Sequence, residues 1–284
     1  MSNTILTPEV IAREALMVLR NNAVMPKLVH RDYSDEFVGA VGDTITVRKP
    51  ATFTANEFTG SIQVQDATET GVAVTMDKHL DVSFAVTSKQ MTLDIADFSA
   101  QLLVPAMQAF ADKVDKYIIE EAKKGGTFEV EGEITTDNVI DARRVLNSKA
   151  APLANRSFVC GPNDEASLLK SELFVSAEKV GDNGTALREA SLGRKLGLDC
   201  YVDQNADTAG IGGVAFHKNA FALVTRPLAA PSGAGKAAIV DYDGFGLRVV
   251  YDYDINKKTD VVSIDMLCGV ATLNKNLAAK IVSA

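Results

Sequence analysis

The strongest constraint on the fold comes from a polar segment, residues 50–71, which separates two runs of alternating apolar residues. Ile45 and Val47 alternate with polar residues before it, and residues 72–86 alternate after it. An apolar side chain at every second position is typical of half-buried strands. The pattern therefore predicts a long two-stranded excursion with an irregular tip. Because a ribbon of this kind is only marginally stable in water, it requires a partner surface.

Residues 94–124 are predicted to form a long helix, because apolar residues recur there at steps of three and four. Gly125 and Gly126 stop the helix. Pro105 predicts a kink, or a join between two helices. At 1.5 Å per residue this helix would measure about 46 Å. That length exceeds the three or four turns that are usual in a globular domain.

The N-terminal segment predicts a short amphipathic helix that begins at Thr7-Pro8-Glu9 and ends before Pro26. Threonine is a preferred N-cap, and proline suits the first helical position. A short helix is not stable alone, so it must pack on its own chain or on a neighbouring one.

The rest of the chain predicts a mixed unit followed by strands. Residues 127–231 alternate between helices and strands, 237–266 follow period two, and 273–284 add an apolar segment. The helices are expected at 136–147 and 163–170, and the strands at 157–160, 198–202 and 214–217. The apolar face of the 136–147 helix is expected to comprise Val139, Ile140, Val145 and Leu146. The chain as a whole is predicted to be α+β.

Composition excludes several functional classes. With 29 Lys and Arg against 37 Asp and Glu, the net charge is −8, which excludes nucleic-acid binding through overall positive charge. Tryptophan is absent and aromatic residues make up 6%, so little material is present for base stacking. Cys160, Cys200 and Cys268 are widely spaced and form no Cys-x-x-Cys pair. They predict reduced, buried thiols in a reducing compartment.

The N-terminus lacks a basic region followed by an apolar run, so no signal peptide is expected. The longest uncharged stretch, 98–111, is too short to span a bilayer. The protein is therefore expected in a reducing aqueous compartment.

No motif in the sequence predicts catalysis. Gly233-Ala-Gly-Lys resembles the end of a phosphate-binding loop, but Ala230 and Ala237 occupy positions that require Gly and Ser or Thr. No Gly-x-Ser-x-Gly elbow occurs, and no histidine has a second ligand at metal-binding spacing. Two Asp-x-Asp pairs could hold a divalent cation, but no loop of the calcium-binding type follows them, so a solvated strand face is the favoured interpretation. These pairs are Asp241 with Asp243, and Asp252 with Asp254. No catalytic, cofactor-binding or metal-binding residue is predicted.

The order of the parts resembles that of the major capsid (coat) proteins of tailed double-stranded DNA bacteriophages, which have the Hong Kong-ninety-seven coat fold. Local phrases similar to the P-twenty-two-like group support the resemblance over essentially the whole chain. These phrases are TPEVIAREAL from Thr7, GDTITVRKP from Gly42, GRKLGLDCYV from Gly193, FHKNAFALVTRPL from Phe216, and the stretch 246–265.

The resemblance implies an architecture with an N-terminal arm, an extended β-loop, a long spine helix, and peripheral and axial domains. The arm would span residues 1–41, the extended loop 42–90, the spine helix of the peripheral domain 91–126, the axial domain 127–230 and the return strands of the peripheral domain 231–284. Some relatives carry a large insertion near the end of the axial domain. Residues 226–236 form only a short loop at that place.

The resemblance also implies a structural role without catalysis or cofactor. Copies of the chain would form hexamers and pentamers of an icosahedral shell around packaged double-stranded DNA, without sequence-specific DNA binding and without a membrane. A scaffolding protein and a portal are implied partners. The protein would be made and assembled in the bacterial host cytoplasm and would reside in the virion capsid. The expected assembly residues are Arg13, Glu14, Arg48, Lys49, Phe53 and Phe58, and the expected hinge is Pro105.

Two alternatives remain at this point. A cellular nanocompartment shell with the same fold would enclose a cargo enzyme instead of DNA. A metal-dependent α/β enzyme would use the region of Asp243, Asp252 and Asp254.

Overall fold

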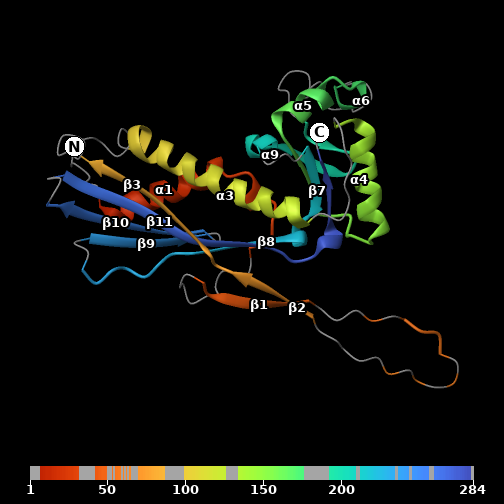
Figure 1. Ribbon diagram of the computed structural model, residues 1–284, viewed down its shortest axis with the longest axis horizontal. Coiled ribbons are helices and arrows are strands. Elements are labelled where there is room, and N and C mark those ends of the chain that lie inside the picture. The colour runs from red at the N-terminus through yellow and green to blue at the C-terminus, as the bar shows by residue number, and fades with distance from the viewer. Residues whose placement is uncertain are drawn as a thin grey trace.

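The computed structural model describes residues 7–31, 42–49, 53, 55–58, 60, 62, 64, 70–86, 99–125, 134–175, 192–208, 212–233, 236–242, 245–255 and 259–282. Two five-stranded sheets and a two-stranded ribbon organise this part of the chain. In Figure 1 the first sheet runs along the long axis beneath two helices. The second sheet and its helices lie at the right-hand end, and the ribbon lies below. No helix in the described part of the chain is long and apolar enough to cross a membrane.

The first sheet is built around one long strand, β11. The strand β10 pairs with residues 259–265 of β11, and β8 pairs with residues 267–272. On the far side of β11 lies β3, and β9 completes the sheet beyond β10. All of these pairings are antiparallel. The strands are β3 (Lys78–Val86), β8 (Phe221–Arg226), β9 (Lys236–Tyr242), β10 (Phe245–Asp254) and β11 (Thr259–Thr272).

Two helices cover one face of this sheet. The helix α1 (Pro8–Asn22) contacts α3 (Val104–Gly125) and also β9 and β10. Its buried residues Ile11, Ala15 and Leu19 belong to the same core as the apolar face of the sheet. The N-terminal helix therefore packs on its own chain, which settles one of the two predicted options. A 3-10 turn, η1 (Met25–Lys27), follows α1 and contacts α3.

The long helix is confirmed where the structure describes it. A π-helical stretch, η4 (Ser99–Leu103), leads into α3, and residues 87–98 lie outside the described residues. Pro105 is the second residue of α3, at the point where the helix type changes. Proline lacks a backbone N–H and fits the first turn of a helix, so it marks a join between two helical segments, as predicted.

The second sheet forms the core of a unit that we call the α/β unit. Its strand order is β12-β7-β4-β6-β5, with β4 and β6 parallel and the other pairs antiparallel. The strands are β4 (Arg156–Cys160), β5 (Arg194–Lys195), β6 (Leu198–Val202), β7 (Gly213–His217) and β12 (Ala278–Ile281). The helices are α4 (Thr136–Ser148), α5 (Pro162–Leu169), α6 (Glu172–Val175) and α9 (Gln204–Thr208), and the short 3-10 turns are η5 (Lys218–Ala220) and η6 (Lys275–Leu277).

The helix α4 starts where predicted, because the Thr135 hydroxyl caps it by accepting the Asn138 N–H at 3.3 Å. Its predicted apolar face is partly wrong. Ile140 is exposed, whereas Val139, Ala142 and Leu146 are buried. The buried face of α4 is thus rotated from the predicted apolar face toward Ala142, because the α/β unit packs against that side of the helix.

Two strands depart from the predicted division of the chain. The strand β8 lies within residues 127–230, yet it pairs with β11 in the first sheet. The strand β12 lies within residues 231–284, yet it pairs with β7 in the α/β unit. Each strand joins the sheet that lies beside it in space instead of the sheet of its sequence neighbours. The exchange makes the two parts of the molecule interdependent.

The ribbon consists of β1 (Thr44–Lys49) and β2 (Thr70–Thr75), paired antiparallel as predicted. Its base has a small core of its own. Val47, Val74 and Met76 are buried together with Val224 of β8 and Leu267 of β11. The body of the same chain therefore supplies the partner surface for the base of the ribbon.

Gly269 permits this seating of the ribbon on β11. A Cβ at position 269 would overlap the carbonyl oxygen of Thr75, where β2 ends. We therefore expect Gly269→Ala to push the ribbon base away from β11 and to cost about 1–3 kcal/mol, as overpacking usually does. Urea denaturation of the unassembled chain measures this loss. Gly233→Ala is the matched control, since nothing lies within 4 Å of the added methyl group, and an equal loss in both variants would contradict the explanation.

Candidate functional site

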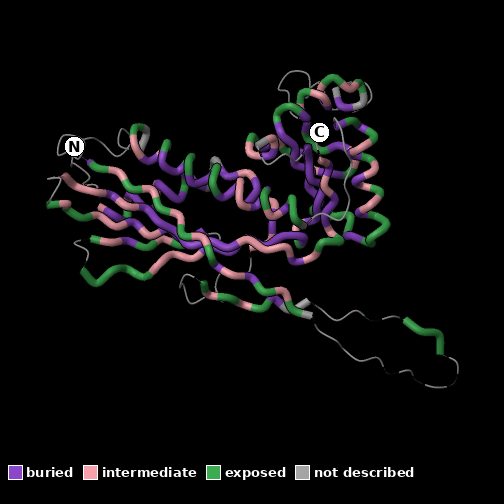
Figure 2. The backbone as a smooth tube through the Cα atoms, viewed as in Figure 1, coloured by how far each residue is buried: buried purple, intermediate pink, exposed green. Residues whose placement is uncertain are grey.

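The segment between β1 and β2, which we call the tip of the ribbon, exposes apolar side chains. Phe53 and Phe58 are 66% and 75% exposed, and Ile62 and Val64 are 84% and 89% exposed. Figure 2 shows the exposed stretch 55–58 far from the body, beyond the end of the ribbon. Exposed apolar side chains gathered on one projecting element are typical of an interaction surface. The apolar content of the ribbon is therefore divided between a buried base and an exposed tip.

The other predicted assembly residues occupy two separate elements. Arg48 and Lys49 are the last residues of β1, opposite Gly71 and Thr70 of β2. Arg13 and Glu14 lie on α1, where Arg13 is exposed and Glu14 is partly buried. Arg48 and Lys49 thus stand at the end of β1 that leads in sequence to Phe53 and Phe58. The structure places Arg13 and Glu14 on a helix that covers the first sheet.

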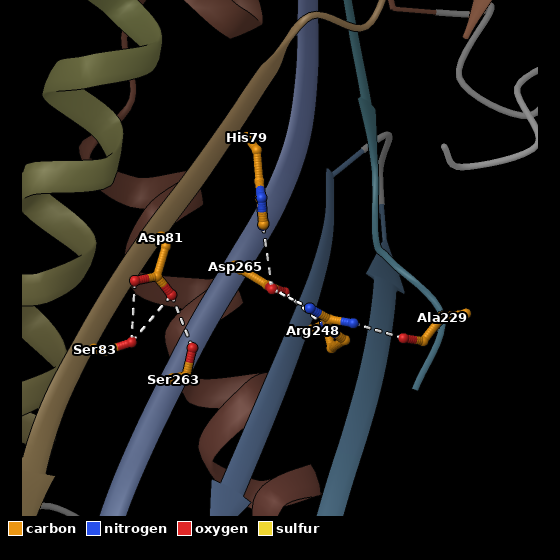
Figure 3. Close-up of polar contacts among 7 residues, drawn as sticks. All are labelled: His79, Asp81, Ser83, Ala229, Arg248, Ser263 and Asp265. Atoms are coloured by element: carbon orange, nitrogen blue, oxygen red, sulfur yellow. Dashed lines mark hydrogen bonds and ion pairs between the residues drawn. The ribbon is translucent and has the colours of Figure 1, made fainter. Parts of the chain in front are cut away.

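A polar network occupies the face of the first sheet that the helices leave uncovered (Figure 3). Asp265 of β11 accepts a hydrogen bond from Arg248 Nε at 2.9 Å and a second from Arg248 Nη2. Arg248 Nη1 donates to the carbonyl oxygen of Ala229 at 2.6 Å, and His79 Nε2 lies 3.3 Å from Asp265. These contacts join β3, β11, β10 and the segment after β8. The network therefore braces the sheet across its strands.

The same face brings Ser, His and Asp together, but not in a catalytic arrangement. Ser83 and Ser263 both donate to Asp81, with distances of 3.0 and 2.8 Å. A nucleophilic serine must instead donate to a histidine, which in turn is held by a carboxylate. Here His79 contacts Asp265, whose other oxygen is taken by Arg248 (Figure 3). The serines satisfy a carboxylate and are not activated.

The structure does not bring the described members of the two Asp-x-Asp pairs together. Asp241 of β9 pairs with Gly246 of β10, whereas Asp252 lies six residues further along β10. At about 3.4 Å per residue this separates Asp241 from Asp252 by about 20 Å. Asp243 lies outside the described residues. No group of three potential metal-binding side chains occurs in the described part of the chain.

Hydrogen bonds at three points fix α3 between the parts of the molecule. Asp115 accepts the backbone N–H groups of Val24 and Met25, each at 3.1 Å, from the segment after α1. Glu121 accepts the Thr272 hydroxyl at 2.8 Å at the end of β11. Lys280 of β12 donates to the carbonyl oxygen of Lys123 at 2.9 Å, near the end of α3. The helix is thus held by the N-terminal segment, the first sheet and the α/β unit.

The sequence pattern did not identify Asp115 or the Arg248–Asp265 pair. Asp115 was detectable in principle, because it is a charged residue beside the apolar positions Val114 and Ile118. Asp265 alternates with Val262 and Ile264 as a solvent-facing residue would, yet it is buried beneath Arg248. Only the cross-strand pairing of Arg248 with Asp265 reveals this burial.

The three cysteines are buried and carry no disulfide, as predicted. Burial raises the pKa of the Cys200 thiol to about 11 and that of Cys268 to about 12, and it also raises the pKa of Cys160. Since the thiolate is the reactive form, we expect a disulfide reagent at pH 7 to label the folded chain at least about a hundred-fold more slowly than the unfolded chain. Fast labelling of all three thiols without denaturant would contradict this burial.

Comparison with known proteins shows what the architecture is similar to. No protein-family model matches the sequence, and no curated protein matches it. A solved structure from Mycobacterium phage Che8 matches with a TM-score of 0.66 at 18% identity, covering 91% of this chain and 90% of the other. The capsid structure of cyanophage P-SCSP1u matches with a TM-score of 0.63 at 11% identity, covering 92% and 88%. A virus-like particle from Pyrococcus furiosus matches with a TM-score of 0.53 at 12% identity, covering 95% and 97%.

These matches cover between 88% and 97% of the chains compared, so the likeness concerns the architecture as a whole. At such low identity the likeness concerns the fold and not the individual residues. The expected fold is thereby confirmed, whereas the narrower resemblance to the P-twenty-two-like group stays a prediction. The chain has the α+β fold of phage capsid subunits.

Proposed function

We propose that this chain is a structural shell subunit, which self-assembles into hexamers and pentamers of an icosahedral capsid around packaged double-stranded phage DNA. The observation that carries the proposal is the projecting ribbon. Its base is buried on the body, while Phe53, Phe58, Ile62 and Val64 at its tip stay exposed. Such a tip gains stability only when a second copy covers it, and repeated contacts between identical copies close into symmetric assemblies.

The fold supports the same proposal, because capsid structures share it. A coat subunit requires no catalytic centre, and the polar network of the first sheet is arranged to brace strands. The further partners are a scaffolding protein, a portal and DNA held without sequence-specific contacts, and the place of assembly is the bacterial host cytoplasm. Under this proposal Arg48 and Lys49 accompany the tip into the contact with a neighbouring copy, and Arg13 and Glu14 contribute from α1.

Expression of the chain alone, and together with its scaffolding protein, tests the proposal. The lysate is separated by velocity sedimentation, and particles are examined for nuclease-protected DNA. Assembly into fast-sedimenting particles of uniform size supports the shell subunit. A chain that sediments only as a monomer or dimer in both cases contradicts it.

A cellular nanocompartment is the second candidate, supported by the likeness to the particle from Pyrococcus furiosus. The contents of the particles separate the two functions. Particles isolated from the native source that contain a long DNA molecule support the virion capsid. Particles that contain one enriched enzyme and no DNA support the nanocompartment.

Pro105 is the proposed hinge of the long helix, since it stands where the π-helical stretch gives way to α3. Alanine would continue a regular helix at this position, because it restores the backbone N–H and carries the highest helix propensity. We expect Pro105→Ala shells to form but to change dimensions more slowly on maturation, as measured by time-resolved light scattering. Maturation at the wild-type rate would count against the hinge.

A further inference from the structure

The contact between α3 and the α/β unit contains two buried carboxyl groups. Asp115 lies in the middle of α3, and Asp203 directly precedes α9 of the α/β unit. Both residues are more than nine-tenths buried. The helices α3 and α9 contact each other. A small apolar cavity lies between them, and its lining includes Ile119 of α3, Ala206 of α9 and Met25 of the N-terminal segment. Three parts of the chain therefore meet at this point.

The two carboxyl groups are satisfied to different degrees. Asp115 accepts the two backbone N–H groups of Val24 and Met25, one on each oxygen. Asp203 accepts the backbone and side-chain N–H groups of Asn205 on Oδ1, at 2.8 and 3.1 Å. Its second oxygen, Oδ2, is buried and has no partner among the described residues. An ionised oxygen in such a position is costly, because a buried charge requires a counter-charge or hydrogen bonds.

The leading electrostatic influences on the two carboxyl groups are themselves acidic. The charged groups that act on Asp115 are Asp203 across the contact and Asp112 on its own helix, and Asp112 acts on Asp203 as well. All three are acidic, so each raises the cost of ionising its neighbours. No group of three potential ligands suited to a metal ion occurs in the described part of the chain. Uptake of a proton would therefore remove one of the charges from this contact.

We propose that Asp115 and Asp203 form a proton-operated joint, at which uptake of a proton by the pair holds the α/β unit against α3 and its release loosens that contact. With a proton on the pair, one of the two like charges disappears from the buried contact. Without it, both charges remain in the buried contact, and withdrawal of α9 from α3 admits water to them. This inference concerns the single subunit and stands apart from the proposed shell function.

The titration sets the pH range in which the joint acts. Burial is the largest cause that raises the pKa of Asp115, to about 7, and the hydrogen bonds from Val24 and Met25 offset only part of the rise. Burial also raises the pKa of Asp203 above its usual value. A carboxyl whose pKa is raised by folding makes its full contribution to the stability of the folded state at pH values below the pKa of the exposed group. That stabilisation is lost as the pH rises through the folded pKa. The joint should therefore be closed at pH 6 and loosened at pH 8.

Hydrogen exchange of the purified, unassembled chain at pH 6 and pH 8 tests the joint. After correction for the intrinsic pH dependence of exchange, opening at residues 23–28 and 203–208 should increase about ten-fold, because one proton is released per opening below the folded pKa and none above it. Asp115→Asn cannot ionise, so this increase should disappear, while the loss of one of the two N–H acceptors raises opening equally at both pH values. Glu120→Gln is the matched control, since it removes an exposed carboxyl from the same helix and should keep the wild-type response.

Three results would overturn the proposal. Equal exchange at these segments at both pH values in the wild-type chain would do so without any variant. A ten-fold increase that persists in both Asp115→Asn and Asp203→Asn would show that other groups are responsible. Restoration of protection at pH 8 by millimolar Mg²⁺ or Ca²⁺ in the wild-type chain alone would replace the proton by a cation. Because the measurement uses unassembled subunits, its failure is distinguishable from a failure to form shells.

Discussion

Replacement of both tip phenylalanines, Phe53→Ser with Phe58→Ser, should abolish shell formation at concentrations that suffice for the wild-type chain. Burial of one such side chain contributes about 1.5–3 kcal/mol. The loss of two therefore removes about 3 kcal/mol or more from each contact between copies. Since every 1.4 kcal/mol corresponds to a factor of ten, the concentration required for assembly should increase more than about a hundred-fold. Velocity sedimentation over a concentration series measures this threshold.

The fold of the subunit should survive this change, because both side chains are already exposed in the single chain. The unfolding midpoint should therefore remain within the error of the wild-type value. Leu153→Ser is the matched control, since Leu153 is 67% exposed but lies in the loop after α4 and not on the ribbon. If the double variant assembled at the wild-type threshold, the tip would not be the contact between copies.

Removal of Arg248 should produce the largest loss of subunit stability among surface-facing substitutions. Arg248→Met leaves Asp265 buried on the first sheet, where His79 Nε2 still lies 3.3 Å from its carboxylate. Loss of one partner of a buried ion pair typically costs about 3–5 kcal/mol, because the other charge stays uncompensated. Urea denaturation of the unassembled chain should show this decrease in the free energy of unfolding.

Two further variants identify the cause of this loss. The double variant Arg248→Met with Asp265→Leu removes both charges and should recover most of the stability, since apolar replacement of a buried pair is often neutral. Arg144→Met breaks an exposed pair with Asp141 on α4 and should cost less than about 1 kcal/mol. A double variant no more stable than Arg248→Met alone would show that packing, and not the uncompensated charge, causes the loss.

Local periodicity was sufficient to predict most individual elements. The N-terminal helix, the long helix with its join at Pro105, the ribbon and the strands within 237–266 all follow from the spacing of apolar residues. These patterns report which side of an element faces a core, and that is a local property. The exposed tip was also predictable, because Phe53 and Phe58 stand isolated in a polar segment.

The spacing of apolar residues could not predict which distant segments pair with each other. Nothing in the composition of β8 or β12 indicates that they exchange sheets, since each is an apolar run that either sheet could accept. The role of Asp265 depends on Arg248 across the strand, and the role of Asp115 depends on the main chain of Val24 and Met25. These contacts join residues far apart in the sequence, so they appear only when the chain is folded.

Negative-stain electron microscopy of the purified chain, alone and with its scaffolding protein, is the most direct test of the shell function. The body of the subunit already covers the base of the ribbon, whereas the tip stays exposed. This arrangement predicts closed polyhedral shells built from rings of five and six subunits. A homogeneous monomer or dimer that forms neither rings nor shells under either condition would contradict the proposed function.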